Sequence, residues 1–195
     1  TNSSTGVGYG HCINNGSISL GGNYTFNGSV SQQLNGTGTL TVASLIVTNA
    51  AGVSLGGSQN ITINNQLRLG NGVVTLNNTN ITVTNATYGG VDANGGCCYS
   101  TSNYIYTNGT GSLKRLMPNA SGNFWFPVGN NNGSVLFTGI NNTSGGLEYY
   151  SVRMIDSLST DYNTLNQPTG TTITSNAVKP TWVIKENTPG SNNAT

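Results

Sequence analysis

The sequence contains unusually few charged residues. Charged residues make up 6% of its 195 residues, and the formal net charge is +1; an ordinary soluble domain has roughly 25%. The six Lys and Arg residues are scattered, and only Lys114 and Arg115 are adjacent. Nucleic-acid binding requires clustered cations that neutralise phosphates, so the composition excludes a nucleic-acid partner. No run approaches the roughly 18 apolar residues of a membrane-spanning helix, so no membrane insertion is expected.

Side chains that carry chemistry are equally scarce. The only histidine is His11, and no two of the five acids lie two or four residues apart on one predicted strand, whereas glycoside hydrolysis needs two facing carboxylates. Asp156 and Asp161 are interpreted as turn formers, with one weak calcium site as the alternative. A G-x-S-x-G pattern surrounds Ser54, but a nucleophile elbow needs a following helix and a histidine partner. The sequence therefore predicts that the protein is not an enzyme and needs no cofactor.

The three cysteines are an odd number, so at least one thiol stays free or pairs outside the chain. We expect Cys12 to form a disulfide with Cys97 or Cys98, which would tie the N-terminal segment to the middle in an oxidising, extracellular setting. A Cys97–Cys98 bridge is a strained alternative. Together with His11 the three would make a zinc ligand set, but adjacent ligands lack the usual spacing, so no metal site is predicted.

What the sequence does contain is Asn, Thr, Ser and 28 Gly residues, with short pairs of Val, Ile and Leu between them. Asn, Ser and Gly favour tight turns, and Thr favours strands. Hydrophobic residues make up only 34% of the chain, but disorder would also require a high net charge. The composition predicts an all-β protein with many turns.

An internal repeat runs through the first half of the chain. Apolar-x-apolar pairs recur at offsets of 22, 21 and 20 residues. The aligned pairs are Leu45/Val47 with Leu67/Leu69, Val53/Leu55 with Val74/Leu76, and Ile61/Ile63 with Ile81/Val83, and Leu40/Val42 and Tyr24/Phe26 extend the pattern upstream. One unit cannot bury its own apolar pairs, so the units must stack. The repeat predicts a short β-solenoid over residues 22–87, with a β-sandwich of regular hairpins as the alternative.

The second half has a different pattern. Residues 88–103 are predicted to be a loop or linker, and Asn-Gly pairs at 108–109 and 132–133 are typical of hairpin turns. The predicted strands are Tyr104–Tyr106, Gly122–Phe126, Val135–Phe137, Glu148–Ile155 and Ala177–Lys185. We therefore expect residues 104–195 to form an antiparallel β-sheet or sandwich, truncated at its C-terminal end, that caps the solenoid. Residues 1–21 are expected to be a separate N-terminal segment.

Several motifs of the second half resemble those of a known family. They are Tyr-x-x-Gly-x-Gly-x-Leu-x-Arg at 106–115, then "GNFWFPVGNNNGS", "GLEYYSVRM" and "VKPTWVIKE". Preceded by a Gly/Asn/Thr-rich β-helical stretch, they resemble secreted multi-domain surface proteins of Bacteroidetes, which are typically large adhesins exported by the type IX secretion system. The specific matches are Phe126–Gly129 and Trp182–Glu186. The resemblance implies an extracellular or cell-surface location and supplies no catalytic residues.

Low charge, a stacked repeat and this resemblance together predict a non-catalytic, secreted structural or adhesive module. Its expected partners are surface glycans or further copies of the same chain, because exposed strand edges and solenoid ends can join molecules into fibres. The alternative is a carbohydrate-binding accessory module of a larger polysaccharide-active protein.

The candidate site residues lie in the middle of the chain. Aromatic rings offer sugars a stacking platform, although use in the core is the alternative. The candidate glycan contacts are Tyr88, Tyr99, Tyr104 and Tyr106.

Two further patterns resemble known sites. Asp156-Ser157-Leu158 resembles the O-glycosylation site of Bacteroidetes, which makes Ser157 a candidate for this modification. The outward Thr62 and Thr82 are similar to the Thr rows of ice-binding solenoids, but two aligned rungs are read as β-favouring residues on a wet face.

Overall fold

The protein consists almost entirely of β-strands. The computed structural model describes residues 11–93, 99–119, 122–130, 138–143, 145–156, 169–172 and 180–188, so the strand predicted at Val135–Phe137 lies outside the described residues. The elements are β1 (His11–Ile13), β2 (Ser17–Phe26), β3 (Gln32–Asn35), β4 (Thr39–Val47), β5 (Val53–Leu55), β6 (Asn60–Leu69), β7 (Val74–Thr75), β8 (Asn80–Val83), the 3-10 helix η1 (Tyr88–Gly90), β9 (Val91–Asp92), β10 (Ile105–Tyr106), β11 (Leu113–Met117), β12 (Phe124–Phe126), β13 (Val128–Gly129), β14 (Thr138–Ile140), β15 (Glu148–Ile155) and β16 (Thr181–Glu186).

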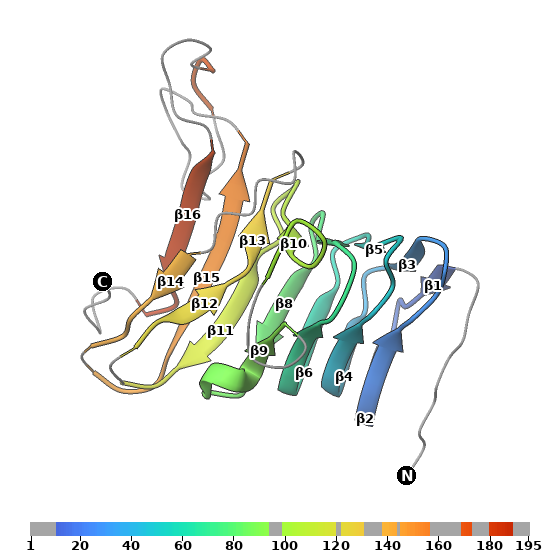
Figure 1. The fold of residues 1–195 in the computed structure, drawn as a ribbon, viewed down its shortest axis with the longest axis horizontal. Coiled ribbons are helices and arrows are strands. Elements are labelled where there is room, and N and C mark those ends of the chain that lie inside the picture. The colour runs from blue at the N-terminus through green and yellow to red at the C-terminus, as the bar shows by residue number, and fades with distance from the viewer. Residues whose placement is uncertain are drawn as a thin grey trace.

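A β-solenoid of about five turns forms most of the molecule. Each turn gives one strand to a sheet of order β1-β3-β5-β7-β10-β13 and one to a larger sheet that runs β2-β4-β6-β8-β11. All of these pairings are parallel. Figure 1 shows the strands of the larger sheet side by side, from β2 at one edge through β8 in the middle. The predicted solenoid is confirmed, and parallel pairing excludes a sandwich of hairpins.

The strand register confirms the repeat found in the sequence. Leu45 of β4 pairs with Tyr24 of β2 and Leu67 of β6, and Ile61 pairs with Ile81 of β8. These residues point inward because alternate side chains of a strand share one face. The aliphatic ones are at most 1% exposed, and burying each stabilises the fold by about 1.5–3 kcal/mol. The core is therefore a column of aliphatic rungs that runs through the stack.

Buried polar side chains hold the corners between the strands. Asn49 Nδ2 donates to the carbonyl oxygen of Val30 at 2.7 Å and to Oε1 of Gln32 at 3.0 Å. Gln59 Nε2 donates to the carbonyl oxygen of Leu34 at 2.9 Å. The backbone leaves the ladder at each corner, and these amides satisfy groups that would otherwise be buried without a partner. The abundance of Asn and Gln thus has a structural use in the coils.

The parallel stack extends beyond the bounds predicted from the repeat. It begins at β1, and β9, inside the predicted linker 88–103, pairs in parallel with β6. Strands β10 and β11, expected to be antiparallel, continue the two parallel sheets. The alignment missed them because the coil from β7 to β10 is longer: Val74 pairs with Ile105, 31 residues further along the chain, instead of 20 to 22.

Antiparallel strands close the far end of the stack. Strand β15 pairs with β11 and β16 pairs with β15, both antiparallel, while β12 and β14 form a separate two-stranded ribbon. The strand predicted at Glu148–Ile155 is β15, and the strand predicted at Ala177–Lys185 appears as β16. The larger sheet therefore has β2 and β16 as its two edges, on opposite sides in Figure 1.

The Asn108–Gly109 pair is a solenoid corner, so its prediction as a hairpin turn is wrong. It connects β10 to β11, which lie in different sheets. Asn108 Nδ2 donates to Oδ1 of Asn77, one coil earlier, at 2.8 Å, and Asn108 Oδ1 accepts from the Asn77 backbone N–H at 3.0 Å. A Cβ at Gly109 would overlap the Asn77 carbonyl. Asn-Gly is compatible with any tight reversal of the chain. Here the contacts with the preceding coil make the pair a corner between two sheets. The pair at 132–133 lies outside the described residues.

Candidate functional site

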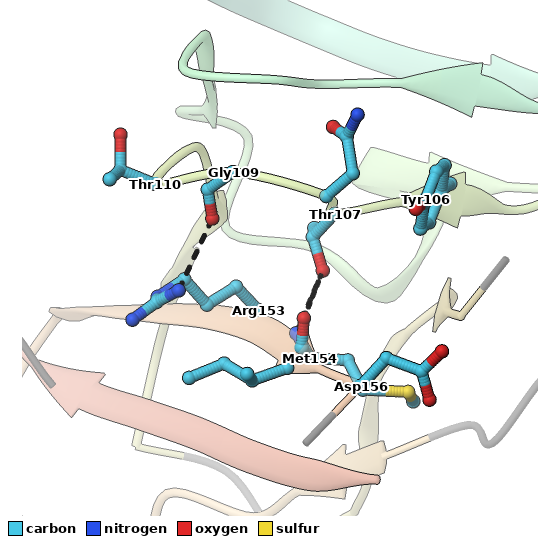
Figure 2. A pocket seen from close by; sticks show the side chains of 9 residues that line it. Tyr106, Thr107, Gly109, Thr110, Arg153, Met154 and Asp156 are labelled. Atoms are coloured by element: carbon cyan, nitrogen blue, oxygen red, sulfur yellow. Dashed lines mark hydrogen bonds between the residues drawn. The ribbon is translucent and has the colours of Figure 1, made fainter. Parts of the chain in front are cut away.

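A pocket of about 220 Å³ lies where the β10–β11 corner meets the end of β15. One wall is formed by Tyr106–Thr110, and the other by Arg153–Asp156. Figure 2 shows the Arg153 guanidinium at one end and Tyr106 with Asp156 at the other. The two walls are about 45 residues apart in sequence, and the antiparallel pairing of β15 with β11 brings them together.

Hydrogen bonds between the two walls fix the shape of the pocket. Thr107 Oγ1 donates to the carbonyl oxygen of Met154 at 2.8 Å and accepts from the Met154 backbone N–H at 2.8 Å. Arg153 Nη1 donates to the carbonyl oxygen of Gly109 at 3.2 Å. Thr107 and Arg153 are both buried. The walls are therefore held in place before any ligand arrives, which lowers the entropic cost of binding.

The electrostatics of the pocket come from one cation and one anion. Burial lowers the pKa of Arg153, and burial followed by the Asp156 carboxylate raises the pKa of Tyr106. Asp156 is exposed, and its Oδ1 accepts from Nδ2 of the buried Asn130 at 3.2 Å. A neutral tyrosine ring therefore lies beside an oriented carboxylate. The sequence pointed to Tyr106 as a candidate contact and to Asp156 as a turn former, but not to Arg153 or to the pocket they share, because only the β11–β15 register brings these residues together.

The four candidate tyrosines have four different environments. Tyr106 lines the pocket. Tyr104 is buried and its hydroxyl donates to the carbonyl oxygen of Asn130 at 2.9 Å, so it belongs to the core. Tyr99 packs against the core, and burial raises its pKa to about 12. Tyr88 is half-exposed and stacks on Phe124 with ring centroids 4.4 Å apart. Of the four, Tyr106 is the one that lines the pocket formed by the described residues.

A buried arginine organises the region between the solenoid and its cap. Arg115 Nη1 donates to the carbonyl oxygen of Trp125 at 2.6 Å, and Nη2 donates to those of Thr87 and Tyr88 at 3.2 and 3.1 Å. The guanidinium also lies 5.2 Å from the ring centroid of Phe124. Arg115 thus ties η1 to β12. Its signal in the sequence is its place between two inward residues in the alternating run "LKRLM".

The other predicted sites are not assembled in the described part of the chain. Cys12 carries a free thiol beside Tyr24, while Cys97 and Cys98 lie outside the described residues, so their pairing stays a prediction. Ser157 and Asp161 lie outside the described residues too. Ser54 is on a strand with no following helix, and its Oγ accepts from Asn77 Nδ2 at 3.2 Å. Among the described residues, no three His, Cys, Asp or Glu side chains are grouped to hold a metal ion.

Comparisons with known proteins add no family or relative. No protein-family model, no curated protein and no solved structure matches this chain. Within the described ranges, no helix has the length and hydropathy needed to cross a membrane. The pocket and the exposed edge of β2 are therefore the features of the molecule that bear on its function.

Proposed function

We propose that this protein is a non-catalytic, secreted adhesive module that binds glycans in the pocket between the β10–β11 corner and β15. The observation that carries the proposal is the placement of the Tyr106 ring beside the Asp156 carboxylate in a cavity of about 220 Å³. Drug-sized ligands occupy pockets of roughly 300–1,000 Å³. This smaller pocket suits a single sugar ring of a longer glycan.

The chemistry of the walls favours a neutral, hydroxyl-rich ligand. The C–H face of a sugar packs on an aromatic ring, and a carboxylate accepts hydrogen bonds from neighbouring hydroxyl groups. Arg153 and Asp156 balance each other in charge, so the pocket does not select an anion or a cation. The few charged groups of the whole chain support the same choice.

The pocket supports binding rather than hydrolysis. Glycoside hydrolysis needs two carboxyl groups on either side of the scissile bond, and among the described residues that line this pocket Asp156 is the only acid. The sole histidine, His11, lies on β1 at the opposite end of the solenoid.

The proposed extracellular location is supported by the resemblance to secreted surface adhesins and by the low-charge, hydrogen-bonded coils.

A glycan array tests the proposal directly. Wild type should bind a set of neutral glycans, and Tyr106→Ala should weaken that binding about two- to tenfold, because an aromatic contact contributes roughly 0.5–1.5 kcal/mol. Asp156→Asn should weaken it by about tenfold or more, because hydrogen bonds to charged groups contribute roughly 1.5–3 kcal/mol. Tyr149→Ala is the matched control, since Tyr149 packs under Lys114 on β15 away from the pocket. Wild type that binds no glycan, or Tyr106→Ala that binds equally well, would contradict the proposal.

Self-assembly is a second candidate function, favoured by the β2 edge of the larger sheet. Strand β2 spans 10 residues and has no charged residue or proline, and its outer edge has no partner strand among the described residues. Natural sheets usually protect such edges with charge, as Lys185 and Glu186 do on β16. If two β2 edges pair with each other, each molecule uses its one unprotected edge. Size-exclusion chromatography should then show dimers that Asn23→Lys disrupts and that Asn64→Lys, on the interior strand β6, does not. Monomers at all concentrations would exclude this assembly.

A further inference from the structure

The outward face of the first half of the larger sheet carries two columns of small polar side chains. We call it the hydroxyl face, and it consists of Ser17, Ser19, Thr39, Thr41, Asn60, Thr62, Asn80 and Thr82. The strand register aligns Ser19 with Thr41, Thr41 with Thr62, and Thr62 with Thr82. Ser17, Thr39, Asn60 and Asn80 form the second column in the same way. The repeat in the sequence had aligned only two rungs of this array, and the structure makes it four.

The hydroxyl face is regular in both directions. Adjacent parallel strands lie about 4.8 Å apart, and alternate residues of one strand about 6.6 Å apart. The register shifts in β2 and β4 come after Leu20 and after Val42, beyond the two columns. The face is therefore a two-dimensional lattice without a bulge. Threonine holds few χ1 rotamers on a strand, which keeps its hydroxyl and methyl groups in repeated positions.

The hydroxyl face is uncharged, and part of its second column is hydrogen-bonded within the molecule. Thr39 Oγ1 donates to Ser17 Oγ at 3.1 Å, and Asn80 Oδ1 accepts from the backbone N–H and the Oγ of Ser112, both at 3.1 Å.

The face has no charged and no aromatic residue, and the first charge in its column is Lys114, which follows Thr82 on β11. The hydroxyls of Thr41 and Thr62 make no hydrogen bond to another group in the described part of the chain, so water alone solvates them. Proteins that bind crystalline polysaccharides stack aromatic rings on the sugars. The hydroxyl face has no aromatic ring for such a contact.

From this lattice we infer that the hydroxyl face binds ice. An uncharged array with two fixed repeats matches an uncharged, ordered lattice of water, whereas charged side chains would hold their own hydration shells. The threonine methyl groups exclude disordered water, and the hydroxyl groups hydrogen-bond to lattice oxygens at repeated positions. The site shares no residue with the glycan pocket and does not depend on it. With four rungs, the array should give weak adsorption that slows recrystallisation.

Slow freezing of the whole chain in dilute buffer is the test. Wild type should be enriched in the ice fraction several-fold over Thr62→Lys, which puts a hydrated charge at the centre of the face, and it should slow ice recrystallisation at micromolar concentrations. Thr75→Lys is the matched control, because Thr75 points outward from β7 in the other sheet and should behave as wild type. Thermal unfolding of all three proteins verifies that each is folded.

Three outcomes overturn the inference. Failure of wild type to be recruited into ice would remove the site. An equal loss of enrichment in ice for Thr62→Lys and Thr75→Lys would show a general effect of the added charge rather than binding by this face. Binding to microcrystalline cellulose or chitin that Thr62→Lys abolishes, without recruitment into ice, would assign the face to a polysaccharide instead. None of these results depends on Tyr106, so the glycan proposal stands or falls separately.

Discussion

Substitution of Arg115 should destabilise the fold more than substitution of any other polar residue. The variant Arg115→Met measures how much Arg115 contributes to the free energy of unfolding. The substitution keeps the side-chain volume but leaves the carbonyl oxygens of Thr87, Tyr88 and Trp125 without their donor. Each buried, unsatisfied carbonyl costs about 1–3 kcal/mol. Against this, burial lowers the pKa of Arg115 to about 10, which corresponds to about 3 kcal/mol of desolvation cost that the substitution removes.

The two effects leave a net loss of about 3 kcal/mol in the free energy of unfolding. For a chain of this size, this corresponds to a melting temperature about 6–12 °C lower. Denaturant unfolding followed by tryptophan fluorescence is a suitable assay, because Trp125 lies next to the site. Lys114→Met is the matched control, since Lys114 is adjacent but points outward, and it should change stability by less than about 0.5 kcal/mol.

Arg115→Lys sharpens the test. A lysine keeps the positive charge but has a compact ammonium group that cannot fork between three carbonyl oxygens, so the loss should equal or exceed that of the methionine variant. If Arg115→Met proves as stable as wild type, the cost of burying the charge balances its hydrogen bonds. The reasoning that the guanidinium holds η1 against β12 would then be refuted.

Two further predictions follow from backbone conformation and from buried hydroxyl groups. Gly72 has φ +99° and a Cβ there would overlap the carbonyl of Asn49, so Gly72→Ala should cost more than about 2 kcal/mol in denaturant unfolding. Gly16→Ala, with open space around it, should be close to neutral, and equal effects would contradict the argument. Burial is the main reason that the pKa values of Tyr24 and Tyr99 both rise to about 12. Because the folded state favours the neutral phenols, their contribution is complete below pH 10 and is lost as the pH rises towards 12. Unfolding curves between pH 8 and 11.5 should show this decline, and Tyr99→Phe should reduce it; an unchanged slope would argue against burial as the cause.

The sequence predicted the coils where the repeat is regular. Apolar pairs at a constant offset have to stack, so the partners of Leu45 and Ile61 were found by counting along the chain. The coil from β7 to β10 was not predicted, because an insertion separates Val74 from Ile105 by 31 residues. An insertion interrupts the constant offset that the sequence repeat relies on. The strands on either side of the insertion still pair through backbone hydrogen bonds. The Asn108–Gly109 corner was misread for a related reason, since Asn-Gly reports a tight reversal and not which strands it joins.

By itself, then, the sequence determined that this protein is a stack of β-coils with a nearly uncharged surface and an aliphatic core. Those properties depend on composition and on alternation within a few residues, which act locally. Only the tertiary structure decided where side chains from distant segments meet. The pairing of β15 with β11 placed Asp156 and Arg153 opposite Tyr106. The continuous register from β2 to β8 added Ser19 and Thr41 to the Thr62 and Thr82 rungs that the repeat had already aligned. Such sites depend on strand pairing across dozens of residues, and a one-residue change of register would turn every side chain to the other face.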